Sequence, residues 1–216
     1  MSEEVPRGQI TLIYGAYSTG KTTFALQTAI SNAKEKFKTL YVDSDNTFST
    51  VRLTQITQNS LDTVSPLIIL FKPRNFMEQG LLFEKLNRYV SDSVSLIVVD
   101  TITSLYRLSL RGPEETFALN RELNRQLALL TEIAIKSDIA VLLTSQVHSI
   151  IDERFTKSKI EPVATRVLNF WSHNILRLTI ANQNSIRMAT LEKLSKKASK
   201  GQPCLYVLTE KGISHI

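Results

Sequence analysis

One segment of the chain has the residue types and spacing of a phosphate-handling loop. Residues 15–22 read Gly-Ala-Tyr-Ser-Thr-Gly-Lys-Thr, which fits the pattern G-x-x-x-x-G-K-[ST]. In such a loop the glycines let the backbone curl, so that its N–H groups and the following helix N-terminus point at phosphate oxygens. Lys21 would reach the β- and γ-phosphates and the Thr22 hydroxyl would ligate Mg²⁺, so the pattern predicts an ATP site. The residues expected to hold the triphosphate are Gly15, Ala16, Tyr17, Ser18, Thr19, Gly20, Lys21, Thr22 and Thr23.

A partner carboxylate for the metal stands at the end of an apolar run. Residues 95–100 read Ser-Leu-Ile-Val-Val-Asp, a buried-strand pattern that ends in Asp100. Alone, an Asp in this position is better explained as the start of a turn. Together with the phosphate loop about 80 residues upstream, it is the Walker B arrangement, and we expect Asp100 to hold the water shell of Mg²⁺.

Hydrolysis also needs a group that orients or deprotonates the attacking water. Asp43 and Asp45 end the run Tyr-Val-Asp-Ser-Asp, and ligands bind at such strand ends in parallel sheets. Asp45 lies beyond the strand and is the expected catalytic carboxylate, whereas Asp43 is expected to be structural. Gln146 ends the run Val-Leu-Leu-Thr-Ser, where it would either hydrogen-bond the γ-phosphate or simply cap the strand.

The elements that must position these residues alternate along the first two-thirds of the chain. Apolar runs predict strands at about 9–14, 39–43, 67–71, 95–99 and 139–145, and helical periodicity predicts helices at about 20–36, 77–91 and 113–136. On the last helix, Phe117, Asn120, Leu123, Leu127, Leu130 and Ala134 fall on one face. This alternation predicts an α/β fold with a mostly parallel central sheet and helices on both faces. Strands at about 174–181, 186–194 and 203–209 would be antiparallel additions at one edge, within a single domain over residues 1–216.

Composition fits a globular protein without a membrane span. The 216 residues include 43% hydrophobic and 21% charged residues, and no apolar run approaches the length of a transmembrane helix. The first residues lack the basic and apolar regions of a signal peptide, and Cys204 is the single cysteine, in a strand-like run where we expect it to be buried. A reducing, cytoplasmic setting is the simplest interpretation.

The net charge of +6 is a mild basic bias. It is concentrated late in the chain, where four lysines fall within eight residues. They are explained either as a solvated hairpin tip or as a patch that contacts phosphates. The four are Lys193, Lys196, Lys197 and Lys200.

Three motifs together resemble a known family. The segment Tyr41–Phe48 with Arg52-Leu53 resembles the segment of RecA-type recombinases that carries their catalytic glutamate. The runs Leu96–Arg107 and Val141–Val147 resemble their Walker B strand and the strand that leads into their second DNA-binding loop, in the same order and spacing. The best fit is to archaeal RadA paralogues of the RadB type, and it runs from about Gly8 to the last residue. The resemblance implies a RecA-like P-loop ATPase core, with Asp45 where recombinases keep a water-activating Glu and with Gln146 as γ-phosphate sensor.

The same resemblance implies two DNA-facing segments. Residues 107–115 would form the first, with Arg107 and Arg111 as its cations, and residues 148–165 the second. In the second, Arg154, Lys157 and Lys159 stand beside Phe155, a combination suited to phosphate contact and base stacking, although a solvated loop has the same composition. The expected partners are single-stranded DNA and a recombinase or another repair protein; an oligomer is left open.

Two differences from the RecA-type pattern lower the activity that we expect of this chain. Asp45 is one methylene shorter than Glu, and a misplacement of about 1 Å can cost about 10²-fold in rate, so weak ATP hydrolysis is expected. We expect the chain to lack the recombinase N-terminal domain and the linker that joins neighbouring protomers. We therefore expect a recombination and repair accessory protein. The alternative is a regulatory nucleotide-binding module that controls a protein–protein contact without DNA; a small-molecule phosphotransferase ranks below both, because the late segments read as strands.

Overall fold

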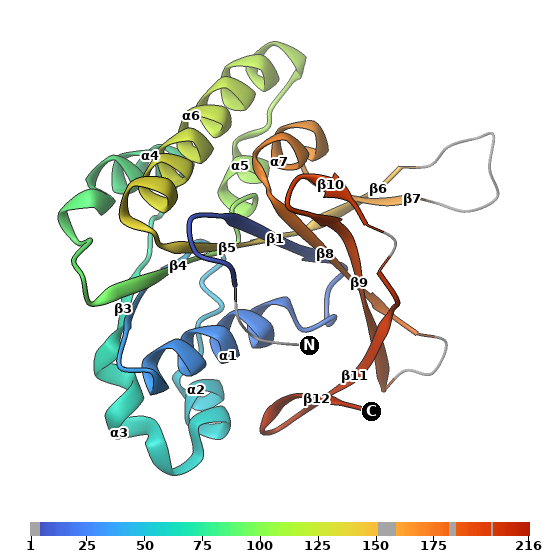
Figure 1. The fold of residues 1–216 in the computed structure, drawn as a ribbon. Helices are drawn as coiled ribbons and strands as arrows, with labels where there is room; N and C mark the ends of the chain where they lie inside the picture. Colours follow the sequence, from blue (N-terminus) through green and yellow to red (C-terminus); the bar gives the residue numbers. More distant parts are fainter. Residues whose placement is uncertain (1–4, 151–158, 182–184, 200) are drawn as a thin grey trace.

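The computed structural model of the chain describes residues 5–150, 159–181, 185–199 and 201–216. Strands and helices alternate over the first two-thirds, as the sequence predicts, and strands dominate the last third (Figure 1). The strands are β1 (Ile10–Gly15), β2 (Lys38–Asp43), β3 (Ile68–Phe71), β4 (Val94–Asp100), β5 (Ala140–Ser145), β6 (Val147–Ile150), β7 (Lys159–Pro162), β8 (Asn174–Ile180), β9 (Ile186–Leu194), β10 (Lys197–Ala198), β11 (Cys204–Thr209) and β12 (Gly212–His215). The helices are α1 (Lys21–Lys34), α2 (Thr50–Thr57), α3 (Leu61–Val64), α4 (Phe76–Lys85), α5 (Ser104–Ser109), α6 (Pro113–Ser137) and α7 (Thr165–Trp171).

Within the described ranges, ten strands form one sheet in the order β12-β11-β9-β8-β1-β5-β4-β2-β3, with β10 paired to β9. The strands from β8 to β3 run parallel to one another, and β9, β11 and β12 continue the sheet in antiparallel fashion. All seven residues of β4 are buried, as expected of a central parallel strand. This arrangement confirms the predicted α/β class.

Helices cover both faces of the sheet (Figure 1). On one face, α1, α2 and α3 pack through Phe24, Ile56 and Val64, respectively, in one cluster with strand side chains such as Ile13 and Val98. On the other face, α4, α5, α6 and α7 pack onto the alternate side chains of the same strands. Since successive residues of a strand point to opposite faces, each apolar parallel strand supplies both layers of the core.

Four details differ from the sequence predictions. β8 joins β1 in parallel, so the antiparallel addition starts only at β9. The expected loop at 148–165 begins and ends as a two-stranded antiparallel ribbon, β6–β7, before α7 starts at Thr165. Phe117 is 77% exposed, because the first turns of α6 extend beyond the sheet (Figure 1). Cys204 is half-buried near the outer end of the sheet, with its Sγ 3.3 Å from His215 Nδ1.

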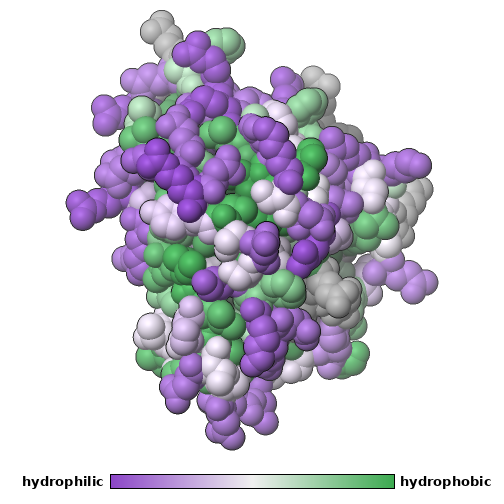
Figure 2. Space-filling model, turned by 60° about the vertical axis from the view of Figure 1, so that its left-hand side comes forward, coloured by the Kyte–Doolittle hydropathy of each residue, from purple (hydrophilic) through white to green (hydrophobic). Residues whose placement is uncertain are grey.

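One lateral edge of the sheet is formed by β3. Figure 2 turns this side of the molecule toward the viewer and shows apolar side chains in patches among hydrophilic ones. Exposed apolar residues on or after β3 include Leu70, Met77, Leu81 and Tyr89. Among the described helices, none is long and apolar enough to cross a bilayer.

Candidate nucleotide-binding site

The phosphate loop leaves the carboxyl end of β1, in the middle of the sheet. Gly20 has a φ of 96°, the left-handed conformation that favours glycine, and it places the loop directly before α1. No side chain caps the N-terminus of α1, and its first turn contains no acidic residue. The N–H groups of this turn are therefore available to an anion, which is the arrangement that a phosphate requires.

Late strands of the chain hold the loop in place. The Tyr206 hydroxyl of β11 donates to the Thr19 carbonyl at 2.7 Å, and the Arg187 guanidinium of β9 donates to the Ser18 carbonyl at 3.0 Å. Within the loop, Thr19 Oγ1 donates to the Ala16 carbonyl at 2.8 Å. Tyr206 is 1% exposed, so its hydroxyl is shielded from water and bonds to the Thr19 carbonyl instead. The loop conformation thus depends on residues almost 190 positions away.

Lys21 lies over the loop that precedes it. Its Nζ donates to the carbonyls of Gly15 and Ala16, at 2.9 Å each. Burial lowers the pKa of Lys21 from its ordinary value, while the nearby carboxylates of Asp100 and Asp45 act in the opposite direction. The lysine, the two carboxylates and the loop therefore form one electrostatic group.

Asp100 is fully buried at the end of β4 and is surrounded by hydroxyls. Its carboxylate accepts hydrogen bonds from Tyr41, Thr144 and Thr22. Burial raises the pKa of Asp100 above its ordinary value; the three hydroxyl donors oppose this shift, and Asp43 adds to it. The two residues predicted to serve the metal, Thr22 and Asp100, are thus in contact.

This donor set fits a magnesium ion that is shared with a nucleotide. One hydroxyl and one carboxylate supply few ligands, and Mg²⁺ usually keeps waters and takes substrate phosphates as further ligands. Within the described part of the chain, no group of three or more His, Cys, Asp or Glu side chains could hold a metal on its own. A metal here would therefore bind together with the triphosphate.

Asp45 and Gln146 meet across the same cavity. Gln146 Nε2 donates to Asp45 Oδ2 at 2.8 Å, and the Arg107 guanidinium donates to Gln146 Oε1 at 2.5 Å. The result is a chain of three side chains that come from the ends of β2 and β5 and from α5. Asp43, by contrast, is buried, and its carboxylate accepts from the backbone N–H groups of Thr47 and Phe48, which is a structural role.

These side chains line a cavity of about 550 Å³. Its lining includes the phosphate loop, Asp45, Thr101, Arg107 and Gln146. Tyr17 of the loop also borders it, with 92% of the side chain exposed. The volume lies in the range of small-molecule sites.

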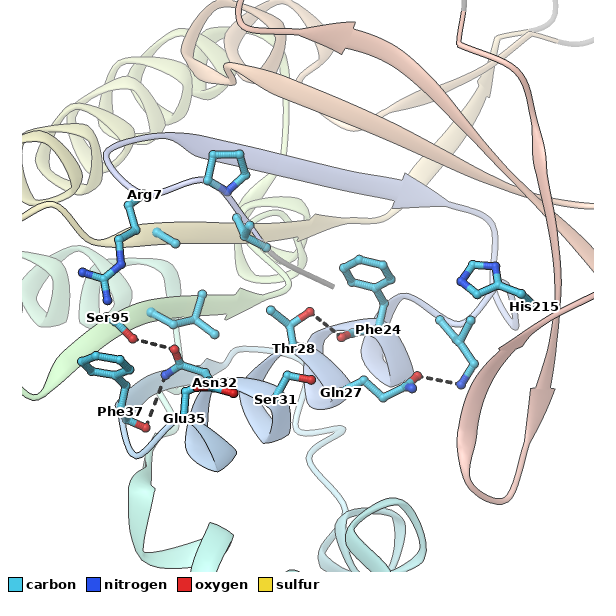
Figure 3. A pocket seen from close by; sticks show the side chains of 15 residues that line it. Arg7, Phe24, Gln27, Thr28, Ser31, Asn32, Glu35, Phe37, Ser95 and His215 are labelled. Carbon is cyan, nitrogen blue, oxygen red and sulfur yellow. Dashed lines mark hydrogen bonds between the residues drawn. The ribbon is translucent and has the colours of Figure 1, made fainter. Parts of the chain in front are cut away.

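A larger cavity of about 1100 Å³ lies between α1, the residues before β1, the starts of β4 and β5, and β12 (Figure 3). Several of its polar side chains already have partners: Asn32 donates to the Phe37 carbonyl and accepts from Ser95 Oγ, and Gln27 accepts from the Ile213 N–H. The phosphate loop and Asp45 do not line this cavity. The smaller cavity, where charged groups and an uncapped helix N-terminus converge, is therefore the candidate nucleotide site.

Comparison with known proteins identifies the family. The Rad51 family model matches residues 3–216. The chain belongs to the Rad51 family. A protein from Thermococcus kodakarensis named DNA repair and recombination protein RadB is 37% identical over 213 residues, which cover 97% of this chain and 91% of the relative. The protein of the same name from Methanobrevibacter smithii is 31% identical, covering 97% and 88%.

A solved structure agrees with this assignment. The crystal structure of the RadB recombinase is similar to this chain with a TM-score of 0.79 and 34% identity, covering 98% of this chain and 92% of that one. The chain is thus a RecA-like Rad51-family protein of the RadB type, which confirms the resemblance inferred from the three motifs.

The predicted DNA-facing residues of this Rad51-family chain have different positions. Arg107 and Arg111 are exposed at the end of α5 and in the connection to α6, and Arg107 also lines the nucleotide cavity. Lys159 belongs to β7, but its side chain lies outside what the structure describes, as do the whole residues Arg154 and Lys157. Of the late lysines, Lys193 caps α7 by donating to the carbonyls of Asn169 and Ser172.

Sequence reasoning missed the hydroxyls that support the site. Register explains one of them: Val99 pairs with Leu143 across β4–β5, so Thr144 stands beside Asp100. Once the strand order is known, a polar residue at this level of β5 is a recognisable signal. Tyr206 gave no comparable local signal, because its partner lies in a distant part of the chain.

Proposed function

We propose that this chain is an ATP-binding, weakly ATP-hydrolysing protein that binds DNA as an accessory factor in recombination and repair. The role in recombination and repair goes with Rad51-family membership of the RadB type. ATPase activity and Mg-ATP binding are general properties of that family. The finer proposal, that hydrolysis is weak and that DNA binding is accessory, rests on the site itself.

The observation that carries the proposal is the Arg107–Gln146–Asp45 chain beside the phosphate loop. Asp45 is the carboxylate among the residues that line the cavity, and Gln146 lies between it and Arg107, a cation on the first DNA-facing segment. A γ-phosphate that attracts Gln146 or Arg107 would change their contacts with each other. Gln146 is also followed directly by β6, the first arm of the second DNA-facing segment.

The proposed chemistry uses each residue in one role. Thr22 and Asp100 would hold Mg²⁺, which when bound neutralises charge on the phosphates. Lys21 and the N–H groups of α1 would bind the β- and γ-phosphates, and Asp45 would orient the attacking water. Because the carboxylate of Asp45 reaches one methylene less far than Glu would, the water is held less well and turnover is slow.

Fluorescence anisotropy of labelled single- and double-stranded oligonucleotides tests this function. Titrations at two salt concentrations, with and without Mg-ATP, should show binding that weakens with salt and responds to ATP. Arg111→Ala should reduce the slope of log affinity against log salt concentration by about 1, the amount expected for the loss of one phosphate contact. Lys136→Ala, which removes a cation from the opposite end of α6, is the matched control and should bind like the wild type.

A different result would favour the regulatory alternative. If the protein binds Mg-ATP but neither DNA form at low salt, the DNA-binding part of the proposal is wrong. The nucleotide would then control a contact with another protein.

A further inference from the structure

A hydrogen-bonded chain of buried polar side chains leads away from the nucleotide site. Ser44 Oγ donates to Gln79 Oε1 of α4 at 2.8 Å, and Gln79 Nε2 donates to Gln126 Oε1 of α6 at 2.8 Å. Gln126 Nε2 in turn donates to the Phe76 carbonyl at 3.2 Å and to Glu122 Oε1 at 3.0 Å. Gln79 and Gln126 have no exposed surface. Since their amide oxygens and nitrogens all have partners, this buried chain is satisfied and rigid rather than costly.

The outer end of the chain is anchored by charges. Arg125 donates to Glu122 of the same helix and to Glu84 of α4, which clamps the two helices together. Gly80 makes room for this contact: an added Cβ would lie 2.5 Å from Glu122 Oε1 and 3.1 Å from Gln126 Nε2. A glycine inside a helix costs stability, and here the glycine allows the polar chain to pass directly over α4.

The inner end of the chain fixes the residue beside Asp45. Ser44 is 7% exposed; its N–H donates to the Asp100 carbonyl at 2.9 Å, and its own carbonyl accepts from Ser104 Oγ at 3.0 Å. Together with Gln79, three elements therefore hold Ser44. Asp45 follows it directly and is the next side chain to enter the cavity.

We propose that Gln79 is a positioning residue for ATP hydrolysis, which acts by holding Ser44 and thereby setting the position of the Asp45 carboxylate. The inference rests on the proposed ATPase function. Gln79 does not line the nucleotide cavity, so it has no direct contact to offer the substrate. Its effect must travel through the backbone between Ser44 and Asp45, where a shift of about 1 Å is enough to change the rate strongly.

The test replaces Gln79 with methionine, which has a similar length but leaves Ser44 Oγ without its acceptor. Single-turnover hydrolysis of labelled ATP should slow by about 10-fold, whereas the affinity for a fluorescent ATP analogue should change less than about twofold, because the phosphate loop is untouched. Ser44→Ala breaks the same contact from the other side. The double variant should therefore lose no more than either single variant.

Hydrogen exchange supplies a readout that needs no ATP. In Gln79→Met, the backbone N–H groups of residues 44–48 should exchange about 10-fold faster, while those of β4 remain as in the wild type. Gln55→Met makes the same chemical change on the exposed side of α2 and is the control for both measurements.

The outcomes separate the inference from the proposed function. If the wild type does not hydrolyse ATP but Gln79→Met accelerates exchange at 44–48, the hydrolysis proposal fails and the positioning of this segment stands. If hydrogen exchange at residues 44–48 is unchanged in Gln79→Met, the inference is overturned. It is also overturned if the hydrolysis rate and the affinity for the ATP analogue fall by the same factor in this variant. If Gln79→Met unfolds, Ser44→Ala replaces it; this variant removes only the Ser44 hydroxyl, and the same two predictions apply to it.

Discussion

Replacing Gly15 with alanine probes how closely the phosphate loop is set against the sheet. A Cβ at this position would lie 2.4 Å from the Leu178 carbonyl oxygen and 2.8 Å from Thr19 Oγ1, whereas real Cβ contacts essentially never fall under 3.0 Å. The gap to Leu178 would have to open by about 0.6 Å. Leu178 is the register partner of Gly15 in β8, so its oxygen is part of the backbone and cannot swing aside as a side chain could.

The cost follows from this geometry. Overpacking a rigid site typically costs about 1–3 kcal/mol, and because the obstacle is backbone we expect the free energy of unfolding to fall by about 3 kcal/mol. A loop displaced from β8 also presents its N–H groups wrongly to phosphate. We expect ATP affinity to fall at least about 10-fold, which corresponds to about 1.4 kcal/mol.

Gly112 provides the matched control. An added Cβ there meets nothing within 4 Å, and the backbone is extended with φ of −175°. Gly112→Ala should cost less than about 1 kcal/mol, the loss of a favourable helix N-cap residue. Urea unfolding and titration with a fluorescent ATP analogue measure both variants. If Gly15→Ala unfolds at the same urea concentration as Gly112→Ala and binds ATP as the wild type does, the argument from close approach is refuted.

Four further predictions concern single residues. Lys21→Ala should abolish ATP binding, and an unchanged nucleotide affinity would contradict the phosphate-loop assignment. Asp45→Glu should raise ATP turnover, by up to about 10²-fold in a phosphate-release assay, and a lower rate would mean that Asp45 is not in the catalytic position. Tyr206→Phe leaves the Thr19 carbonyl without its donor and should cost about 1–2 kcal/mol in urea unfolding together with weaker ATP binding; equal stability would show that this contact is dispensable. His173 Nδ1 accepts a hydrogen bond from the Ile10 N–H, and burial, followed by the nearby Lys196 and Lys193, lowers the pKa of His173 from 6.5. Its contribution to the free energy of unfolding should therefore be complete above pH 6.5 and be lost as the pH falls through the lower folded-state pKa. The stability of His173→Asn should depend less on pH in urea unfolding, and identical pH curves for variant and wild type would exclude this titration.

The elements that carry the nucleotide site could be predicted from the sequence because their signals are local. The glycines and Lys21 are spaced by the loop itself, and the apolar run before Asp100 marks a buried strand with a polar end. The strand order β1-β5-β4-β2 then brings those ends together. The contacts of Asp43 agree with its expected structural role, since a carboxylate still within the strand accepts from its own backbone turn, whereas the catalytic role of Asp45 remains a prediction.

The features that could not be predicted depend on tertiary contacts. Phe117 fits the helical period of the buried face, yet it is exposed because the sheet does not reach the first turns of α6. Cys204 fits a strand pattern, but its strand lies outside the helix-covered centre. The buried glutamines of α4 and α6 resemble surface residues in sequence, and only the crossing of the two helices beside Ser44 gives them partners.

The tie between Tyr206 and the phosphate loop has a consequence for the order in which this protein is made. The loop is complete by residue 23, but β1 gains both neighbours only after β5 and then β8 exist, and the Thr19 carbonyl gains its donor only with β11. Contacts of such long sequence separation are slow to form, because the chain loses loop-closure entropy before they stabilise it. A nascent chain therefore carries its phosphate-loop motif long before the later strands that hold the loop in shape have been made.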